Sequence, residues 1–139
     1  SLTDEQSKIV TSLFHTVNDI ERIGDHCENI AELASYKITN MLSFSDEALS
    51  ELKDMYGKVK EAVDISLSSL DSMNKDMALD VMQREIQIDE IDDRLRDEHI
   101  DRLNKEVCSP SSGAIFLDLI SNLERMGDYA TNIAEVILK

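Results

Sequence analysis

The chain has 139 residues, enough for one domain with a complete hydrophobic core. Its formal net charge is −15, which argues against nucleic-acid binding because that requires basic surfaces. Hydrophobic residues make up 42% of the chain and aromatic residues only 4%, with one proline and no tryptophan, which favours an all-helical fold with an aliphatic core. No apolar run approaches the roughly 20 residues that span a bilayer, so direct membrane insertion is not expected.

Apolar and small residues recur every three or four positions in four successive stretches, the pattern of helices that bury one face. The first stretch begins at Thr3, which forms a capping-box pattern with Gln6, and ends near residue 42. Ser45 is the expected N-cap of the second helix. A tight connection at residues 74–76 leads to the third helix, with Asp76 as its expected cap.

The fourth helix is expected to begin near Ala114, because residues 109–113 contain proline and glycine and predict a loop. Four long helices joined by short connections predict an antiparallel bundle. The apolar stripe of each helix should form its core. In the first helix this stripe comprises Leu13, Val17, Ile20, Gly24, Cys27, Ala31, Ala34, Ile38 and Met41, and in the fourth it comprises Phe116, Leu119, Leu123, Met126, Ala130, Ile133 and Ile137.

One phrase occurs twice, in the first and the fourth helix. Residues 21–34 and 124–137 share eight of fourteen positions: Glu, Arg, Gly, Asp, Asn, Ile, Ala and Glu. A repeat of this kind indicates two related helices, each closing one supersecondary unit. Each copy keeps a glycine inside the helix, where glycine costs about 1 kcal/mol relative to alanine, so Gly24 and Gly127 are expected to allow close helix–helix approach.

Each copy also holds a glutamate and an aspartate four residues apart, which places both carboxylates on one helix face. These pairs are Glu21 with Asp25 and Glu124 with Asp128, and the third helix adds Glu85 with Asp89. If the third and fourth helices pack antiparallel, their two pairs converge into a cluster that requires a cation, because like charges so close do not all stay ionised unaided. Oxygen ligands suit magnesium, calcium, manganese or iron. The alternative interpretation is a solvated acidic patch.

Two further residue types recur beside the carboxylates. Arg22 and Arg125 follow the glutamates directly and favour ion pairs to a neighbouring helix, with orientation of the carboxylates as a supporting role. Asn29 and Asn132 lie four residues beyond the aspartates and either cap the site or hydrogen-bond the adjacent helix. The sequence leaves these two roles of the asparagines open.

Catalytic motifs are absent from the sequence. No HExxH, phosphate-binding loop, GxSxG or dinucleotide fingerprint occurs. No acid stands three residues before a histidine, which counts against the Glu-x-x-His pairs of di-iron bundle oxidases. The chain is therefore expected not to be an enzyme. A carboxylate-bridged metal enzyme is one rival interpretation, and a metal-free helical protein-interaction module is the other.

The repeated phrase Glu-Arg-Ile-Gly-Asp-His…Asn-Ile-Ala-Glu at 21–32, with its second copy at 124–135, resembles the signature helix of PhoU-type domains. Residues 85–89 resemble the preceding helix of the same unit. The stretch from His99 through Asn104, together with Cys108 and residues 116–119, resembles the PhoU-like tail of bacterial sodium/phosphate cotransporter-related proteins. The similarity covers most of the chain.

This resemblance implies three-helix repeats, usually in two copies, that regulate phosphate uptake at the cytoplasmic face of the membrane. Residues 1–42 would be the last helix of a truncated first repeat, and residues 46–139 a complete second repeat. Some family members bind iron or zinc clusters through carboxylate motifs, which fall here on Glu21, Asp25, Glu85, Asp89, Glu124 and Asp128. The Glu21/Asp25 half-site would lack its partner within this chain, and the face left uncovered predicts a homodimer.

The sequence thus predicts a non-catalytic PhoU-like regulatory domain of phosphate transport. Its expected cofactor is a metal ion: iron, zinc, manganese or magnesium. Its expected partner is a membrane phosphate transporter, which could be an upstream part of the same polypeptide.

Overall fold

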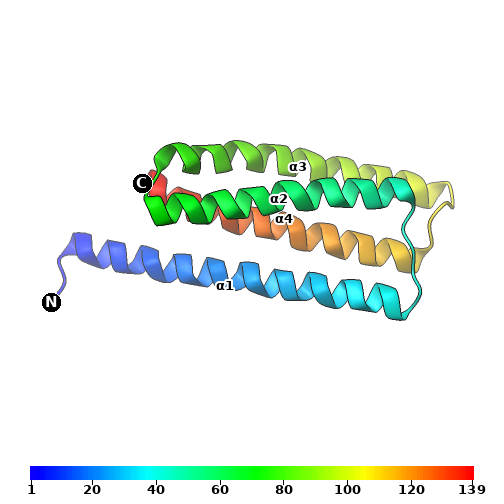
Figure 1. Cartoon of the computed structure of the whole chain (residues 1–139), viewed down its shortest axis with the longest axis horizontal. Coiled ribbons are helices and arrows are strands. Elements are labelled where there is room, and N and C mark those ends of the chain that lie inside the picture. The colour runs from blue at the N-terminus through cyan, green and yellow to red at the C-terminus, as the bar shows by residue number, and fades with distance from the viewer.

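The structure is a computed structural model that describes all of residues 1–139, and it contains only helices. The four helices are α1 (Asp4–Thr39), α2 (Asp46–Ser72), α3 (Lys75–Asn104) and α4 (Pro110–Leu138), and successive helices run in opposite directions (Figure 1). The predicted all-α fold with four long helices is confirmed. None of the helices has an apolar stretch long enough to cross a bilayer.

Two of the predicted helix caps are confirmed. The Thr3 hydroxyl accepts a hydrogen bond from the Gln6 amide at 3.1 Å, while the Gln6 side chain accepts one from the Thr3 amide at 3.0 Å. The Ser45 hydroxyl accepts from the Ala48 amide at 3.1 Å and so begins α2. These bonds satisfy amide groups that have no partner inside the helix.

The predicted starts of the third and fourth helices were wrong by a few residues. Asn74, not Asp76, caps α3, because Met73 adopts a left-handed conformation that ends α2 and reverses the chain at once. The last helix begins at Pro110 rather than near Ala114, with Ser109 as its cap. Proline favours the first helical position because the amide hydrogen that it lacks would have no partner there.

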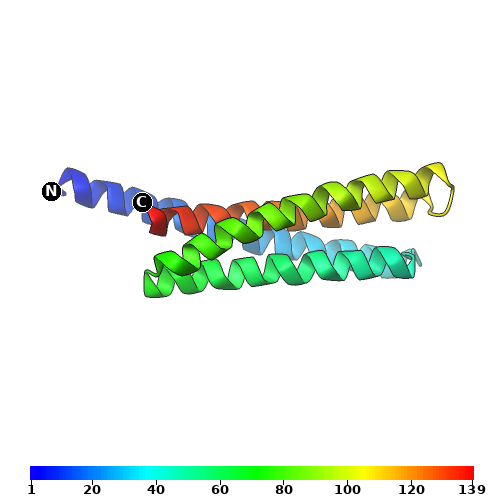
Figure 2. The same ribbon diagram turned by 90° about the horizontal axis from the view of Figure 1, so that it is seen from above.

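Helices α2, α3 and α4 contact one another and form a three-helix bundle, whereas α1 contacts only α4 (Figures 1 and 2). The first turns of α1 project beyond the end of this bundle in both views. All seven stripe residues predicted for α4 are buried. The main hydrophobic core joins four of them, Phe116, Leu123, Met126 and Ile133, to side chains of α2 and α3 that include Met55, Val59, Ile88, Ile91 and Leu95.

The stripe predicted as the core face of α1 was wrong, because its residues are exposed. Val17 is 60% exposed and Ile38 is 74% exposed, and Cys27 is exposed as well. The buried residues of α1 are instead Thr16, Asp19 and Ile23, on the adjacent face. The physical reason is that α1 has one neighbouring helix, and α4 covers that adjacent face.

The repeat shows what the exposed face of α1 corresponds to in α4. Adding 103 to a residue number relates the first copy of the phrase to the second, so Val17 corresponds to Ile120 and Cys27 to Ala130. Ile120 and Ala130 are fully buried in the three-helix bundle. The exposed stripe of α1 is therefore the counterpart of the face that α4 buries against α2 and α3. The division of the chain into a truncated and a complete repeat agrees with this correspondence and stays a prediction.

Candidate metal site

Four carboxylates meet where α3 packs against α4. One oxygen from each of Glu85, Asp89, Glu124 and Asp128 lies within 4.8 Å of the other three. The two glutamates are half-buried and the two aspartates are exposed, so the cluster opens to solvent on one side. The convergence that the sequence suggested for these two pairs is present in the structure.

Gly127 makes room for the most buried of these carboxylates. A Cβ atom at this position would lie 2.7 Å from Glu85 Oε2 and 3.6 Å from two atoms of Ile88. Because Gly127 is itself buried, the α3 side chains approach the α4 backbone directly. The glycine of the second copy of the phrase thus serves the close helix approach expected from the sequence.

The cluster holds protons that isolated carboxylates would release. Burial, followed by interactions with Asp128 and the other acids, raises the pKa of Glu85 from 4.5 to about 9. Burial and the nearby charge of Asp128 raise the pKa of Glu124 to about 7. The pKa of Asp89 is also raised, first by burial and then by Asp128. At neutral pH and without a cation, Glu85 therefore keeps its proton and Glu124 is partly protonated.

The donor set fits a hard cation. All four ligand groups are carboxylates, and Glu85 Oε2 is buried without a hydrogen-bond partner in the protein. A cation at the centre would satisfy this oxygen and replace the bound protons. Carboxylate-only ligation suits magnesium, manganese, calcium or iron better than it suits a soft metal.

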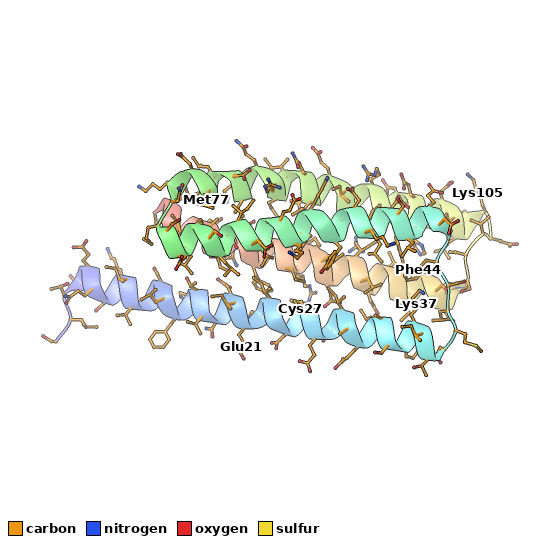
Figure 3. The ribbon with its side chains drawn as sticks, viewed as in Figure 1. Glu21, Cys27, Lys37, Phe44, Met77 and Lys105 are labelled. Atoms are coloured by element: carbon orange, nitrogen blue, oxygen red, sulfur yellow. The ribbon has the colours of Figure 1, made fainter.

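The first copy of the phrase does not assemble an equivalent cluster. Glu21 and Asp25 are both exposed, and no third acid, histidine or cysteine joins them. Figure 3 shows Glu21 on α1, the helix that lies apart from α2 and α3. A Cβ atom at Gly24 would meet nothing within 4 Å, so the glycine of this copy has no close approach to serve in the present chain.

Arg22 and Arg125, which were predicted to support the carboxylates, have different surroundings in the structure. Neither arginine of the repeated phrase forms an ion pair, which contradicts the favoured interpretation of both. Arg22 lies over the Tyr129 ring of α4, with its guanidinium carbon 5.7 Å from the ring centre, whereas Arg125 is exposed.

The asparagines also diverge. The Asn29 side chain donates a hydrogen bond to Asn122 Oδ1 of α4 at 3.2 Å, and His26 contacts the same oxygen at 2.7 Å. Asn29 thus joins α1 to α4 instead of capping the site. Asn132 is exposed and makes no side-chain hydrogen bond.

Sequence reasoning missed one neighbour of the cluster, Asp92. Its charge contributes to the raised pKa of Glu124, and burial raises its own pKa. Arg96 opposes this by donating to Asp92 Oδ1 at 3.0 Å, and it also donates to the Ser121 hydroxyl of α4 at 3.0 Å. The signal was available, because Asp92 follows Asp89 by three residues and so lies on the same face of α3.

The fold and the cluster together define a class: all-helical domains in which acidic pairs on adjacent helices form one carboxylate cluster. The sequence pattern that defines the PhoU domain family matches residues 2–34 and 52–137, which is most of the chain. The chain therefore belongs to the PhoU domain family, as the repeated phrase indicated.

Curated relatives support this membership. The chain is 28% identical over 134 residues to "Phosphate-specific transport system accessory protein PhoU homolog 1" of Thermotoga maritima, covering 96% of this chain and 57% of that protein. It is 31% identical over 119 residues to a PhoU homolog of Clostridium acetobutylicum, covering 86% of this chain and 53% of that protein. The chain thus spans about half the length of the curated relatives it matches. No solved structure matches it significantly.

The two glycines of the repeat should respond differently to alanine. Gly24→Ala should raise the free energy of unfolding by about 1 kcal/mol, because alanine favours the helix and meets no neighbour. Gly127→Ala should gain less or lose stability, because the new Cβ must displace the Glu85 carboxylate. Urea denaturation of the metal-free proteins measures both changes. Equal gains from the two substitutions would contradict the assigned role of Gly127.

Without metal, the protein should become less stable as the pH rises, because of the raised pKa of Glu85. In the folded state this group keeps its proton up to a pKa of about 9, whereas the ordinary value is 4.5. Between pH 4.5 and about 9, unfolding therefore releases a proton from Glu85. The contribution of Glu85 to the free energy of unfolding is complete below pH 4.5 and is lost as the pH rises through about 9. Glu85→Gln should flatten this dependence in denaturation curves recorded with a chelator from acidic to alkaline pH.

The matched control is Glu90→Gln, which neutralises an exposed acid of the same helix. It should leave the slope of stability against pH close to that of the unmodified protein. Parallel slopes for all three proteins would show that Glu85 does not retain its proton.

Proposed function

We propose that the chain is a non-catalytic regulatory domain of phosphate transport that binds a metal ion through Glu85, Asp89, Glu124 and Asp128. The observation that supports metal binding most is the convergence of four carboxylate oxygens within 4.8 Å, with one of them buried and unpartnered. The ion would be iron, zinc, manganese or magnesium. Its oxygen ligands favour the harder ions of this set.

A metal at this position would act on the packing of the bundle. It would remove the repulsion between the acids of α3 and α4 and tie the two helices together at the middle of their contact. Because α4 also holds α1, the ion would stiffen the connection between the three-helix bundle and the exposed stripe of α1. The domain would then present this stripe in a fixed orientation to its partner.

The proposed partner is a membrane phosphate transporter. The names of the relatives describe accessory proteins of a phosphate-specific transport system. The partner could equally be a transporter region of the same polypeptide, with the domain at the cytoplasmic face of the membrane. The exposed apolar stripe of α1 offers a surface for this contact or for a homodimer.

A second candidate function is a helical protein-interaction module without metal. The observation that favours it is the same apolar stripe, whose residues remain exposed in this chain. An enzymatic role has less support, because the carboxylate cluster has no histidine or cysteine among its members.

Metal analysis separates these candidates. Protein purified without a metal-affinity column and incubated with each ion should retain stoichiometric metal in plasma mass spectrometry. Glu124→Ala/Asp128→Ala should lose it, because two of the four ligands are removed. The matched control is Glu21→Ala/Asp25→Ala, which removes the same residue types from the first copy and should retain the metal. Absence of metal from the unmodified protein would leave the interaction module as the function.

A transport assay tests the regulatory role. Phosphate uptake by cells that lack the gene should respond differently to external phosphate from uptake by cells that express the protein. Glu124→Ala/Asp128→Ala should behave like the deletion, provided that its abundance is unchanged. Uptake that is identical in all three strains would refute a role in phosphate transport.

A further inference from the structure

A small pocket lies at the end of the molecule where α2 and α4 begin and α3 ends (Figure 1). Its volume is about 20 Å³, and its lining includes His99 and Arg102 of α3 and Ser112 of α4. Figure 3 shows the same end of the molecule, where Phe44, which also lines the pocket, lies near Lys37. The three polar side chains are buried, with His99 2% exposed and Arg102 8% exposed.

Two polar atoms of this lining have no partner. His99 Nε2 and Arg102 Nη2 are buried and make no hydrogen bond within the protein. Leaving such a group unsatisfied lowers stability, and more so when the group is charged. Neither side chain can easily turn away, because both pack on the Phe116 ring, at 5.6 Å for the His99 ring and 5.5 Å for the guanidinium carbon.

The other groups around the pocket also favour the binding of a hydrogen-bond acceptor. Helix α4 begins here, with Ser109 as its cap and Ser112 in its first turn, so the positive end of the helix dipole points to this region. Burial and the adjacent Arg102 lower the pKa of His99, which favours the neutral imidazole, and its single N–H is a donor to the pocket in the tautomer that carries the hydrogen on Nε2. The Ser112 hydroxyl supplies another donor.

We propose that this pocket binds a small tetrahedral oxyanion, such as inorganic phosphate or sulfate, through Arg102 Nη2, His99 Nε2 and the Ser112 hydroxyl. The volume admits one oxygen of the ion, and the remaining oxygens would lie at the mouth. The site is separate from the carboxylate cluster, because Ser112 and Glu124 are 12 residues apart on one helix, or about 18 Å.

The acids near Arg102 set the strength of this binding. Glu51 accepts a hydrogen bond from Arg102 Nη1 at 3.0 Å, and carboxylate oxygens of Glu47 and Glu98 lie within 4.8 Å of a Glu51 oxygen. The charge of the guanidinium is therefore already compensated on one edge. Binding would depend on directed hydrogen bonds at the other edge, which predicts a millimolar rather than a micromolar affinity.

The test is a titration of the ¹⁵N-labelled full chain with inorganic phosphate, in a chelator and at constant ionic strength. Saturable shifts should appear at the His99 ring nitrogens and at the backbone amides of residues 111–113. Sulfate should produce the same pattern, whereas chloride should not. If phosphate gives no saturable shift at these positions, the pocket does not bind an oxyanion and its polar atoms are satisfied by water.

Two variants identify the donors. Arg102→Lys keeps the charge that faces Glu51 but loses the second guanidinium nitrogen, and Ser112→Ala removes only a hydroxyl. Each should weaken phosphate binding, about tenfold for Arg102→Lys because a charge-assisted hydrogen bond is lost. Arg125→Lys is the matched control, because Arg125 is an exposed arginine of α4 that does not line the pocket and pairs with none of the acids near Arg102. Binding that is unchanged in both variants, with circular dichroism showing them folded, would overturn the proposal.

A last variant separates this proposal from the metal site. Glu124→Gln/Asp128→Asn removes two metal ligands and, when the titration is repeated with magnesium in place of the chelator, should bind phosphate as the unmodified protein does. Loss of phosphate binding in this variant would mean that the ion binds through a metal at the carboxylate cluster, which would also overturn the proposal.

Discussion

The structure depends on α4, because it is the only helix that contacts all three others. A helix with neighbours on two faces has little surface left for charged side chains. Its residues from Phe116 to Ile137 accordingly bury a continuous apolar face, and Glu124 and Asp128 occupy part of the remaining surface, beside α3. There they meet Glu85 and Asp89. The like-charge cluster thus lies at the edge of the contact between α3 and α4, and its repulsion is what protons or a cation must relieve.

Periodicity in the sequence determines which residues share a helix face but not whether that face has a neighbour. For α4 the predicted stripe is buried in full, because α2 and α3 cover it. For α1 the equivalent stripe is exposed, because no helix of this chain covers it. The two glycines show the same difference, since Gly127 borders a carboxylate of α3 and Gly24 borders nothing. The sequence therefore predicted the helices and the α4 core correctly, but the faces of α1 follow from packing alone.

The carboxylate cluster could be predicted from the sequence, because the repeat contains Glu124 and Asp128 and the four-residue spacing identifies Glu85 and Asp89. The pocket at His99 and Arg102 could not be predicted, because these polar residues interrupt the apolar pattern of α3. The buried face of that helix continues from Ile91 and Leu95 through His99 and Arg102 at steps of three or four. The apolar residues nearby are Ile100 and Leu103, yet both are exposed. Polar residues on a buried face are recognised only when their neighbours are known.

The two candidate sites differ in chemistry although they lie on the same pair of helices. At the middle of α3 and α4 four acids repel one another, whereas at the end of the pair two buried donors have no partner. Interiors as closely packed as this one transmit small displacements instead of absorbing them. A shift of α4 along α3 at either site would therefore also displace α1, whose backbone packs on α4. The exposed stripe of α1 would move with it, although the stripe touches neither site.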